Sequence, residues 1–382
     1  MILPHGGKLV DRIAKGEERK RIIAQSKNLY RIKLSNEHIQ EIFNIGTGVF
    51  SPLEGFLNKK ELSSVLNKSR LPNGVAWTVP IVLDVPSFIY SEIKRQKKLV
   101  LMDEEGQDLA LMNVDEVYKY DKKAFAKKVY GTLDKSHPGV AKVFSMGDYL
   151  IGGKLTVIEK PQSKFVKYAL TPKETRAKFA SMGWKRVVAF QTRNVPHMGH
   201  EYVQKNALSY VDGLFINPVI GKKKTGDYRD ELIIKTYEAL TKNYYHKDHT
   251  FMSILQMTMR YAGPKEAIHH AIIRKNFGCT HIIIGRDHAG VGDFYHPFAA
   301  QKIFDEFPDI DIKPIFFKSF FWCNVCGTVA NDKTCPHSGS DLENFSGTNI
   351  RGILQKGKIP SAKLMRPEVS KCIVSYKSPY VE

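Results

Sequence analysis

The sequence predicts an α/β protein whose largest part is a doubly wound parallel sheet. Short apolar runs alternate with helical patterns from about residue 166 onward. The apolar runs cover residues 186–190, 213–220, 251–256, 281–285 and 312–316, and the helical stretches include 230–245, 265–277 and 297–307. In such sheets ligands bind at the carboxyl ends of the strands, so the polar segments that follow these runs are the candidate sites.

The part before residue 166 is expected to be a separate, β-rich domain. Residues 98–120 carry a hairpin signal, two apolar runs about an acidic turn, and a second pair of strands is expected to flank Gly152 and Gly153. Residues 36–44 have a short helical pattern.

Domain limits follow from changes in pattern. The polar stretch 159–164 contains Pro161 and predicts a boundary. Thr171 and Glu174, with a proline between them, then predict a helix start. We expect domains at residues 1–165, 166–320 and 321–382, a number that suits a chain of 382 residues.

Composition bounds the class of protein. Neither a signal peptide nor an apolar run long enough to cross a bilayer is found, so a cytoplasmic location is expected. The net charge of +19 favours anionic partners, either nucleic acid or small anionic substrates. A highly charged surface typical of a hot or salty habitat would give the same balance, and charge alone does not separate these.

The densest polar cluster lies where the run 186–190 passes into a helix. The segment reads QTRNVPHMGHE and contains six candidate ligand-binding side chains: Gln191, Thr192, Arg193, Asn194, His197 and His200. A helix N-terminus attracts phosphate, and Arg193 adds a planar fork of donors. His197 and His200 are three residues apart, so both imidazoles can lie on one face of the first turn.

A second segment follows the run 281–285. Gly285 ends this run, and Arg286, Asp287, His288 and Ala289 follow at once. The glycine permits close approach of backbone to ligand. The basic side chains can meet phosphate, and the carboxylate can accept from a ribose or adenine donor.

A cysteine-rich stretch begins near residue 321. Cys323, Cys326, Cys335 and His337 fall within fifteen residues and predict a tetrahedral structural zinc site. The alternative is four unconnected residues in a reduced loop. The remaining cysteines, Cys279 and Cys372, are expected to be buried thiols.

The extended motifs resemble those of ATP sulfurylases (sulfate adenylyltransferases). His197-Met-Gly-His200 matches the His-x-Gly-His signature of nucleotidyltransferases, and Gln191-Thr-Arg-Asn194 with Glu201 matches the ATP sulfurylase version of it. Gly285-Arg-Asp-His-Ala289 resembles the second ATP-binding segment of that family. Further matching segments are PHGG near the start, FSPLEGF, HPGV, MRYAGP and SGTNIR, so the resemblance covers nearly the whole chain.

The resemblance implies a Rossmann-like nucleotidyltransferase domain, an N-terminal PUA-like domain and a small C-terminal domain. It implies ATP binding by Gln191, Thr192, Arg193, Asn194, Gly285, Arg286, Asp287 and His288. It implies sulfate binding by Gln191, Arg193 and Ala289, and catalysis by Thr192, Arg193, Asn194, His197 and His200. The implied reaction is direct attack of sulfate on the α-phosphorus of ATP, which gives adenylylsulfate and pyrophosphate.

The implied cofactors are Mg²⁺, which travels with ATP, and a structural Zn²⁺ that some members of the family carry. A homodimer or higher homo-oligomer is expected, and nucleic acid and membrane partners are not. Two alternatives stay open from the sequence: an adenylyltransferase with another acceptor, and an RNA-binding protein that uses a basic PUA-like domain.

Overall fold

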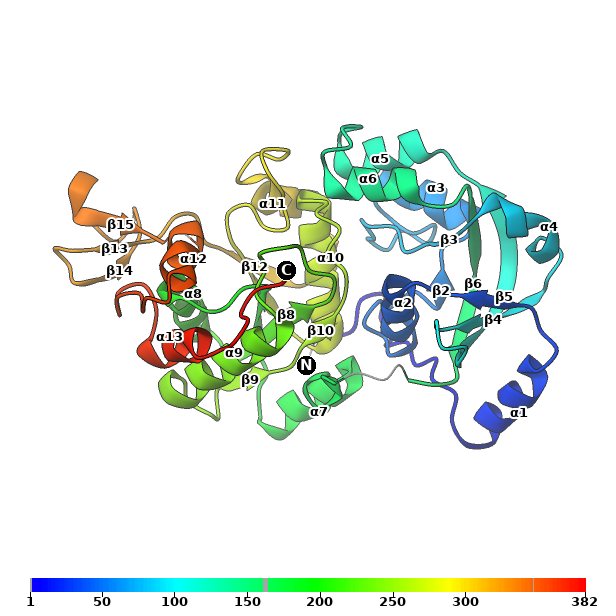
Figure 1. Cartoon of the computed structure of the whole chain (residues 1–382), viewed down its shortest axis with the longest axis horizontal. Coiled ribbons are helices and arrows are strands. Elements are labelled where there is room, and N and C mark those ends of the chain that lie inside the picture. Colours follow the sequence, from blue (N-terminus) through cyan, green and yellow to red (C-terminus); the bar gives the residue numbers. More distant parts are fainter. Residues whose placement is uncertain (1, 161–163, 346) are drawn as a thin grey trace. The chain divides into compact units, whose positions relative to one another are not determined.

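The computed structural model describes residues 2–160, 164–345 and 347–382 (Figure 1). The chain forms two compact units, each assembled from separated segments. The first unit comprises Met1–Lys178, Met257–Thr280 and Asp287–Ile312, and the second comprises Phe179–Gln256, His281–Arg286 and Lys313–Glu382. The domain limits expected at residues 165 and 320 remain predictions. Pro161, in the expected boundary, lies outside the described residues, as does Ser346.

The first unit contains a mostly antiparallel sheet of six strands, in the order β1-β4-β5-β6-β2 with β3 also paired to β6. The strands are β1 (Arg31–Lys33), β2 (Gly55–Phe56), β3 (Leu83–Val85), β4 (Lys98–Met102), β5 (Asp108–Lys119) and β6 (Tyr149–Val157). β4 and β5 pair antiparallel, so the hairpin predicted over residues 98–120 is confirmed.

The strand pair expected about Gly152 and Gly153 is wrong, because both glycines lie inside the single strand β6. Their role is close packing. A Cβ at Gly152 would lie 2.4 Å from the backbone of Asn58, and a Cβ at Gly153 would lie 2.1 Å from the carbonyl oxygen of Asn113. The glycines therefore allow neighbouring backbone to approach, and they do not form a turn.

The helices of the first unit come from its N-terminal segment and from the two later segments that belong to it. They are α1 (Gly16–Ser26), α2 (Asn36–Gly46), α3 (Lys59–Lys68), α4 (Tyr90–Ile93), α5 (Lys122–Tyr130), α6 (Pro138–Ser145), α10 (Pro264–Phe277) and α11 (Ala299–Lys302). The helix expected over 297–307 is shorter than predicted, since α11 changes into a 3₁₀ helix at Ile303–Glu306.

The helix start predicted at Thr171 is confirmed. α7 (Pro172–Ser181) begins directly after it. The Glu174 carboxylate accepts from the Thr171 backbone N–H at 2.7 Å, and the Thr171 hydroxyl accepts from the Glu174 N–H at 3.4 Å. This is the reciprocal capping that the sequence pattern indicates.

The second unit is built on a parallel sheet in the order β10-β8-β7-β11-β12, with β9 also paired to β8. The strands are β7 (Val187–Thr192), β8 (Gly213–Ile220), β9 (Thr250–Met252), β10 (Leu255–Gln256), β11 (His281–Ile284) and β12 (Lys313–Phe316). β7, the first strand in the sequence, lies in the middle, and the strand order reverses between β7 and β11. This is the doubly wound arrangement that the sequence predicts, and ligands bind at such a reversal.

Helices α8 (Met198–Leu208), α9 (Asp230–Tyr244), α12 (Gly347–Gln355) and α13 (Pro367–Val374) belong to the second unit. Residues of α8, α9, α12 and α13 join those of β7 and β8 in one buried apolar cluster. A small sheet in the order β14-β13-β15 follows β12, and it is drawn in orange in Figure 1. Its strands are β13 (Phe321–Cys323), β14 (Thr328–Ala330) and β15 (Leu342–Asn344). Among the described residues, no helix is long and apolar enough to cross a membrane.

Candidate active site

The turn between β7 and α8 carries the two histidines. His197 is the N-cap of α8, and its Nδ1 accepts a hydrogen bond from the Gly199 N–H at 3.1 Å. Because Nδ1 accepts, the ring proton of the neutral imidazole is on Nε2, which can donate to a ligand. The helix N-terminus favours an anion at the same place.

His200 lies against His197, as the spacing predicts. The two ring centroids are 3.8 Å apart and the rings are stacked, with 21° between their planes. Burial lowers the pKa of His200 to about 4, against an opposing hydrogen bond to the backbone of Val195. Burial, and next the neighbouring His200, lower the pKa of His197 well below its usual value. Both rings are therefore neutral hydrogen-bonding groups at neutral pH.

Two aromatic side chains that flank the small C-terminal sheet, Phe320 before β13 and Phe345 after β15, pack on this turn. Phe345 is stacked with His197 at 5.9 Å between centroids, and Phe320 lies 5.9 Å from Phe345. A Cβ at Gly199 would lie 2.3 Å from the Phe320 ring and 3.0 Å from the His197 ring. Glycine is therefore required between the two histidines because a side chain would displace both rings.

Arg193 is held by the loop that follows β8. Its Nη2 donates to the Lys222 carbonyl at 3.0 Å and lies 3.4 Å from a carboxylate oxygen of Asp227. The same oxygen of Asp227 accepts from the Lys224 N–H at 3.1 Å. The basic loop 221–227 is thus folded onto Arg193, whose side chain is 17% exposed. Sequence reasoning missed Asp227, because nothing in the sequence places it next to Arg193.

The other residues of the turn form local structure. The Thr192 hydroxyl accepts from the Asn194 N–H at 3.1 Å, which closes the turn on itself. Gln191 is level with Asn217 on β8. Asn217 is fully buried and donates to the Ser253 carbonyl, which is a structural role.

The second candidate segment starts at the end of β11. β11 pairs with β7 in parallel, with Ile282 level with Ala189. Continuing this register places Gly285 and Arg286 level with the end of β7, so these two residues are at the reversal point of the sheet. Asp287, His288 and Ala289 begin a segment of the first unit.

This segment has a strained backbone, and its histidine contacts a buried histidine of α10. Asp287 (φ 53°) and Ala289 (φ 58°) both adopt left-handed conformations, which an alanine holds only where the surrounding structure fixes it. His288 Nε2 lies 3.1 Å from Nδ1 of His270, and Nε2 of His270 lies 3.4 Å from the Glu266 carboxylate. Burial, and next His270, lower the pKa of His288 to about 3. No pattern in the sequence indicates His270 or Glu266 as partners of this segment.

The predicted metal ligands come together. The ligand atoms of Cys323, Cys326, Cys335 and His337 all lie within 4.8 Å of one another. His337 Nδ1 is 3.3 Å from Cys326 Sγ and 3.5 Å from each of the other two sulfurs, and the sulfurs of Cys326 and Cys335 are 3.7 Å apart. A tetrahedral zinc ion with ordinary bond lengths requires about 3.8 Å between sulfurs and about 3.5 Å from sulfur to nitrogen. The four side chains therefore fit such an ion, and His337 fits as the fourth ligand.

Of the two other cysteines, Cys279 is buried, as expected, whereas Cys372 is only partly buried.

A sheet with this strand order, and a donor-rich turn at its reversal point, defines a nucleotide-binding α/β enzyme. A family model described as ATP-sulfurylase matches residues 166–376, and one described as a PUA-like domain matches residues 2–160. The chain belongs to the ATP-sulfurylase family. The prediction of this family from the sequence motifs is thereby confirmed, together with the predicted PUA-like N-terminal domain.

Curated relatives agree over the full length. The chain is 49% identical to a sulfate adenylyltransferase of Ignicoccus hospitalis over 378 residues, which are 99% of both chains. It is 50% identical to a sulfate adenylyltransferase of Pyrococcus abyssi over 379 residues, again 99% of both. A solved structure, the hexameric APS kinase from Thiobacillus denitrificans, shares the fold with a TM-score of 0.78 at 23% identity, over 98% of this chain and 68% of that one.

Proposed function

We propose that this chain transfers the adenylyl group of ATP to sulfate and releases pyrophosphate, and that the histidine turn stabilises the transition state. A sulfate oxygen attacks the α-phosphorus, the bond to the β-phosphate oxygen breaks, and adenosine 5'-phosphosulfate forms. The reaction is reversible. The observation that carries the assignment of roles is the stacked pair His197 and His200 at the N-terminus of α8, next to the point where the strand order reverses.

The roles of the other residues follow the family motifs. ATP is bound by Gln191, Thr192, Arg193, Asn194, Gly285, Arg286, Asp287 and His288. Sulfate is bound by Gln191, Arg193 and Ala289. The catalytic residues are Thr192, Arg193, Asn194, His197 and His200. Supporting features are the left-handed backbone at Asp287 and Ala289 and the end-of-strand position of Gly285 and Arg286.

His197 acts as a neutral donor rather than as an acid or a base, and His200 is stacked on its ring. The proton on Nε2 of His197 is fixed by the bond from Gly199, so it can stabilise charge that develops on the phosphoryl oxygens. A well-placed donor of this kind contributes about 3 kcal/mol to the transition state. Transfer between two anions depends on such positioning more than on proton transfer.

Arg193 changes partner when an anion binds. Without a ligand, a carboxylate oxygen of Asp227 lies 3.4 Å from the guanidinium and neutralises it. A bound sulfate or phosphate oxygen takes the place of this carboxylate, because a bidentate oxyanion matches the arginine fork. The loop 221–227 is thereby released from Arg193 as the substrate binds.

Mg²⁺ bound to ATP would supply neutralisation of its phosphate charges. Zn²⁺ is the metal that suits three thiolates and one imidazole in a tetrahedral site. The small sheet around it buries only a few apolar side chains, Phe321, Cys323 and Ala330 among the described residues. Metal binding is therefore the main source of order in this segment. Phe345, stacked on His197 and in contact with Phe320, links the ordered segment to the histidine turn.

A homodimer or larger homo-oligomer and a cytoplasmic location complete the proposal. The similar solved structure is hexameric, which supports an assembly without giving its size here. Light scattering of the purified chain measures the assembly.

The stereochemistry at phosphorus tests the direct transfer. With ATP that carries sulfur at a defined position on the α-phosphorus, a single in-line displacement by sulfate gives inverted configuration in the product. Retention would require two displacements and a covalent enzyme intermediate, and it would refute the mechanism.

A further inference from the structure

Residues 258–263, in the loop between β10 and α10, have a strained backbone conformation that neighbouring side chains must hold in place. Tyr261 (φ 61°) and Gly263 (φ 52°) both lie in the left-handed region. A tyrosine holds this conformation only where neighbouring groups fix it. A side chain at position 263 is also excluded, because its Cβ would lie 2.7 Å from the ring of Tyr295. The contacts that fix this backbone therefore identify the parts of the protein to which the loop is coupled.

Two buried side chains bind the backbone of this loop. The Glu266 carboxylate accepts from the N–H groups of Arg260 and Ala262, both at 2.9 Å. His137 is fully buried, and its Nδ1 accepts from the first turn of α6, which leaves the ring proton on Nε2. This Nε2 donates to the Tyr261 carbonyl at 3.1 Å.

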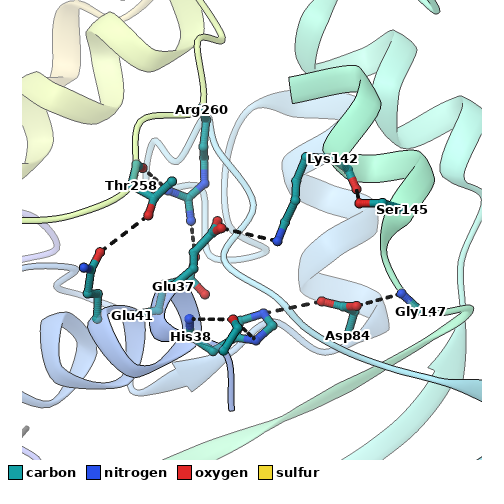
Figure 2. A network of polar contacts seen from close by, with 11 residues as sticks. Glu37, His38, Glu41, Asp84, Lys142, Ser145, Gly147, Thr258 and Arg260 are labelled. Carbon is teal, nitrogen blue, oxygen red and sulfur yellow. Dashed lines mark hydrogen bonds and ion pairs between the residues drawn. The ribbon is translucent and has the colours of Figure 1, made fainter. Parts of the chain in front are cut away.

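The side chain of Arg260 fixes the loop to α2 (Figure 2). Its guanidinium forms an ion pair with Glu41, and the two side chains are 11% and 6% exposed. It also donates to the Thr258 carbonyl at 3.1 Å. Burial disfavours the charge, yet Glu41 and next Glu37 raise the pKa of Arg260. Glu37 is itself 3.3 Å from Lys142 of α6. The loop is thus held by a network of charged side chains from two helices of the PUA-like domain, in which the pair of Arg260 and Glu41 is the least exposed.

The loop in turn holds the second candidate segment. The Gly263 N–H donates to the Ala289 carbonyl at 3.0 Å. This hydrogen bond helps to hold Ala289 in its left-handed conformation. Glu266, which binds the loop backbone, is also 3.4 Å from His270, the partner of His288. Movement of the loop would therefore displace both Ala289 and His288.

We propose that the PUA-like domain clamps the segment 287–289 through the 258–263 loop, and that Glu41, Arg260 and His137 are positioning residues for the substrates. The inference rests on the proposed function, which gives Ala289 to sulfate and His288 to ATP. In this proposal the PUA-like domain positions substrate-binding residues of the enzyme. Its acidic residues Glu41 and Glu37 interact with Arg260, and the domain is not used to bind a nucleic acid.

Glu41→Gln tests the clamp, because it keeps the shape of the side chain and removes the charge that pairs with Arg260. We expect the KM for sulfate to rise about tenfold with kcat changed by less than about threefold, since a small displacement of a binding group weakens a ground-state contact. Hydrogen exchange followed by mass spectrometry should be faster in peptides that cover residues 258–263 and 287–290, and unchanged over β7.

Matched variants separate positioning from general stability. Glu54→Gln removes an exposed ion pair with Lys154 in the same domain and should change neither KM nor exchange. Arg260→Lys, which keeps the charge beside Glu41, should lie closer to wild type than Arg260→Met in both measurements. An unchanged KM in Glu41→Gln and Arg260→Met, or exchange that rises evenly through the domain, would overturn the proposal. A wild-type chain without sulfate-dependent activity would refute the proposed function instead, and the exchange measurement would still test the clamp.

Discussion

Replacing His197 tests whether the histidine turn stabilises the transition state. Two variants separate the loss of the Nε2 donor, which lowers kcat, from the loss of the helix cap, which lowers stability. His197→Ala removes the Nε2 donor and also the acceptor that caps α8. Loss of a donor to developing charge costs about 3 to 4 kcal/mol, or 10² to 10³ in kcat. Loss of an N-cap costs about 1 kcal/mol of stability. His197→Asn keeps a capping oxygen but does not reach as far as the imidazole, so it should lose the same factor in kcat with little loss of stability.

The assay is steady-state kinetics in parallel with thermal unfolding and equilibrium ATP binding. We expect ATP binding to be largely retained in both variants, because the donor acts in the transition state. Only His197→Ala should show a lower Tm, by a few degrees. A kcat loss below tenfold, or an equal loss of ATP affinity and kcat, would refute the reasoning.

Three further predictions concern the metal, the basic loop and acid stability. Removal of zinc by a chelator, or Cys335→Ser, should shift the Trp322 fluorescence to the red and lower kcat, and colorimetric zinc release should give one ion per chain. Asp227→Asn should lower the KM for sulfate about fivefold, because an ion pair of about 1 kcal/mol no longer competes for Arg193, whereas a higher KM would mean that the carboxylate orients the arginine. Stability should fall as pH drops below about 6.5, by up to about 1.4 kcal/mol per pH unit for each histidine, because the unfolded chain binds protons that the buried rings refuse. Urea unfolding between pH 7.5 and 5 measures this, and a flat profile would contradict the lowered pKa values of His5, His197, His200, His269, His270 and His288.

Much of the second unit could be predicted from the sequence because its central strands, β7 and β8, are buried on both faces. β8 has the predicted bounds, 213–220, since every residue in it is buried and the apolar run is continuous. The expected strand 251–256 is instead two strands, β9 and β10, separated by Ser253 and Ile254. The fully buried Ser253 accepts from Asn217 across the sheet, a contact that no local pattern indicates.

The histidine turn was accessible to sequence reasoning because its chemistry is local. His197 and His200 are three residues apart on one helix, and helix geometry alone brings them together. The metal cluster is local for the same reason. Asp227, His270 and Glu41 were missed, since each acts on a partner at least eighteen residues away in the sequence and reaches it only through the fold. The two glycines of β6 were misread because glycine serves both turns and close strand packing.

The most direct test of the central claim is ATP formation from adenylylsulfate and pyrophosphate in the presence of Mg²⁺. The proposed function predicts rapid ATP formation by the wild-type chain, and loss of that activity in Arg193→Ala, measured on samples that are folded and carry zinc. Absence of ATP formation in the wild-type sample would contradict sulfate as the acceptor, and retained activity in Arg193→Ala would contradict the site.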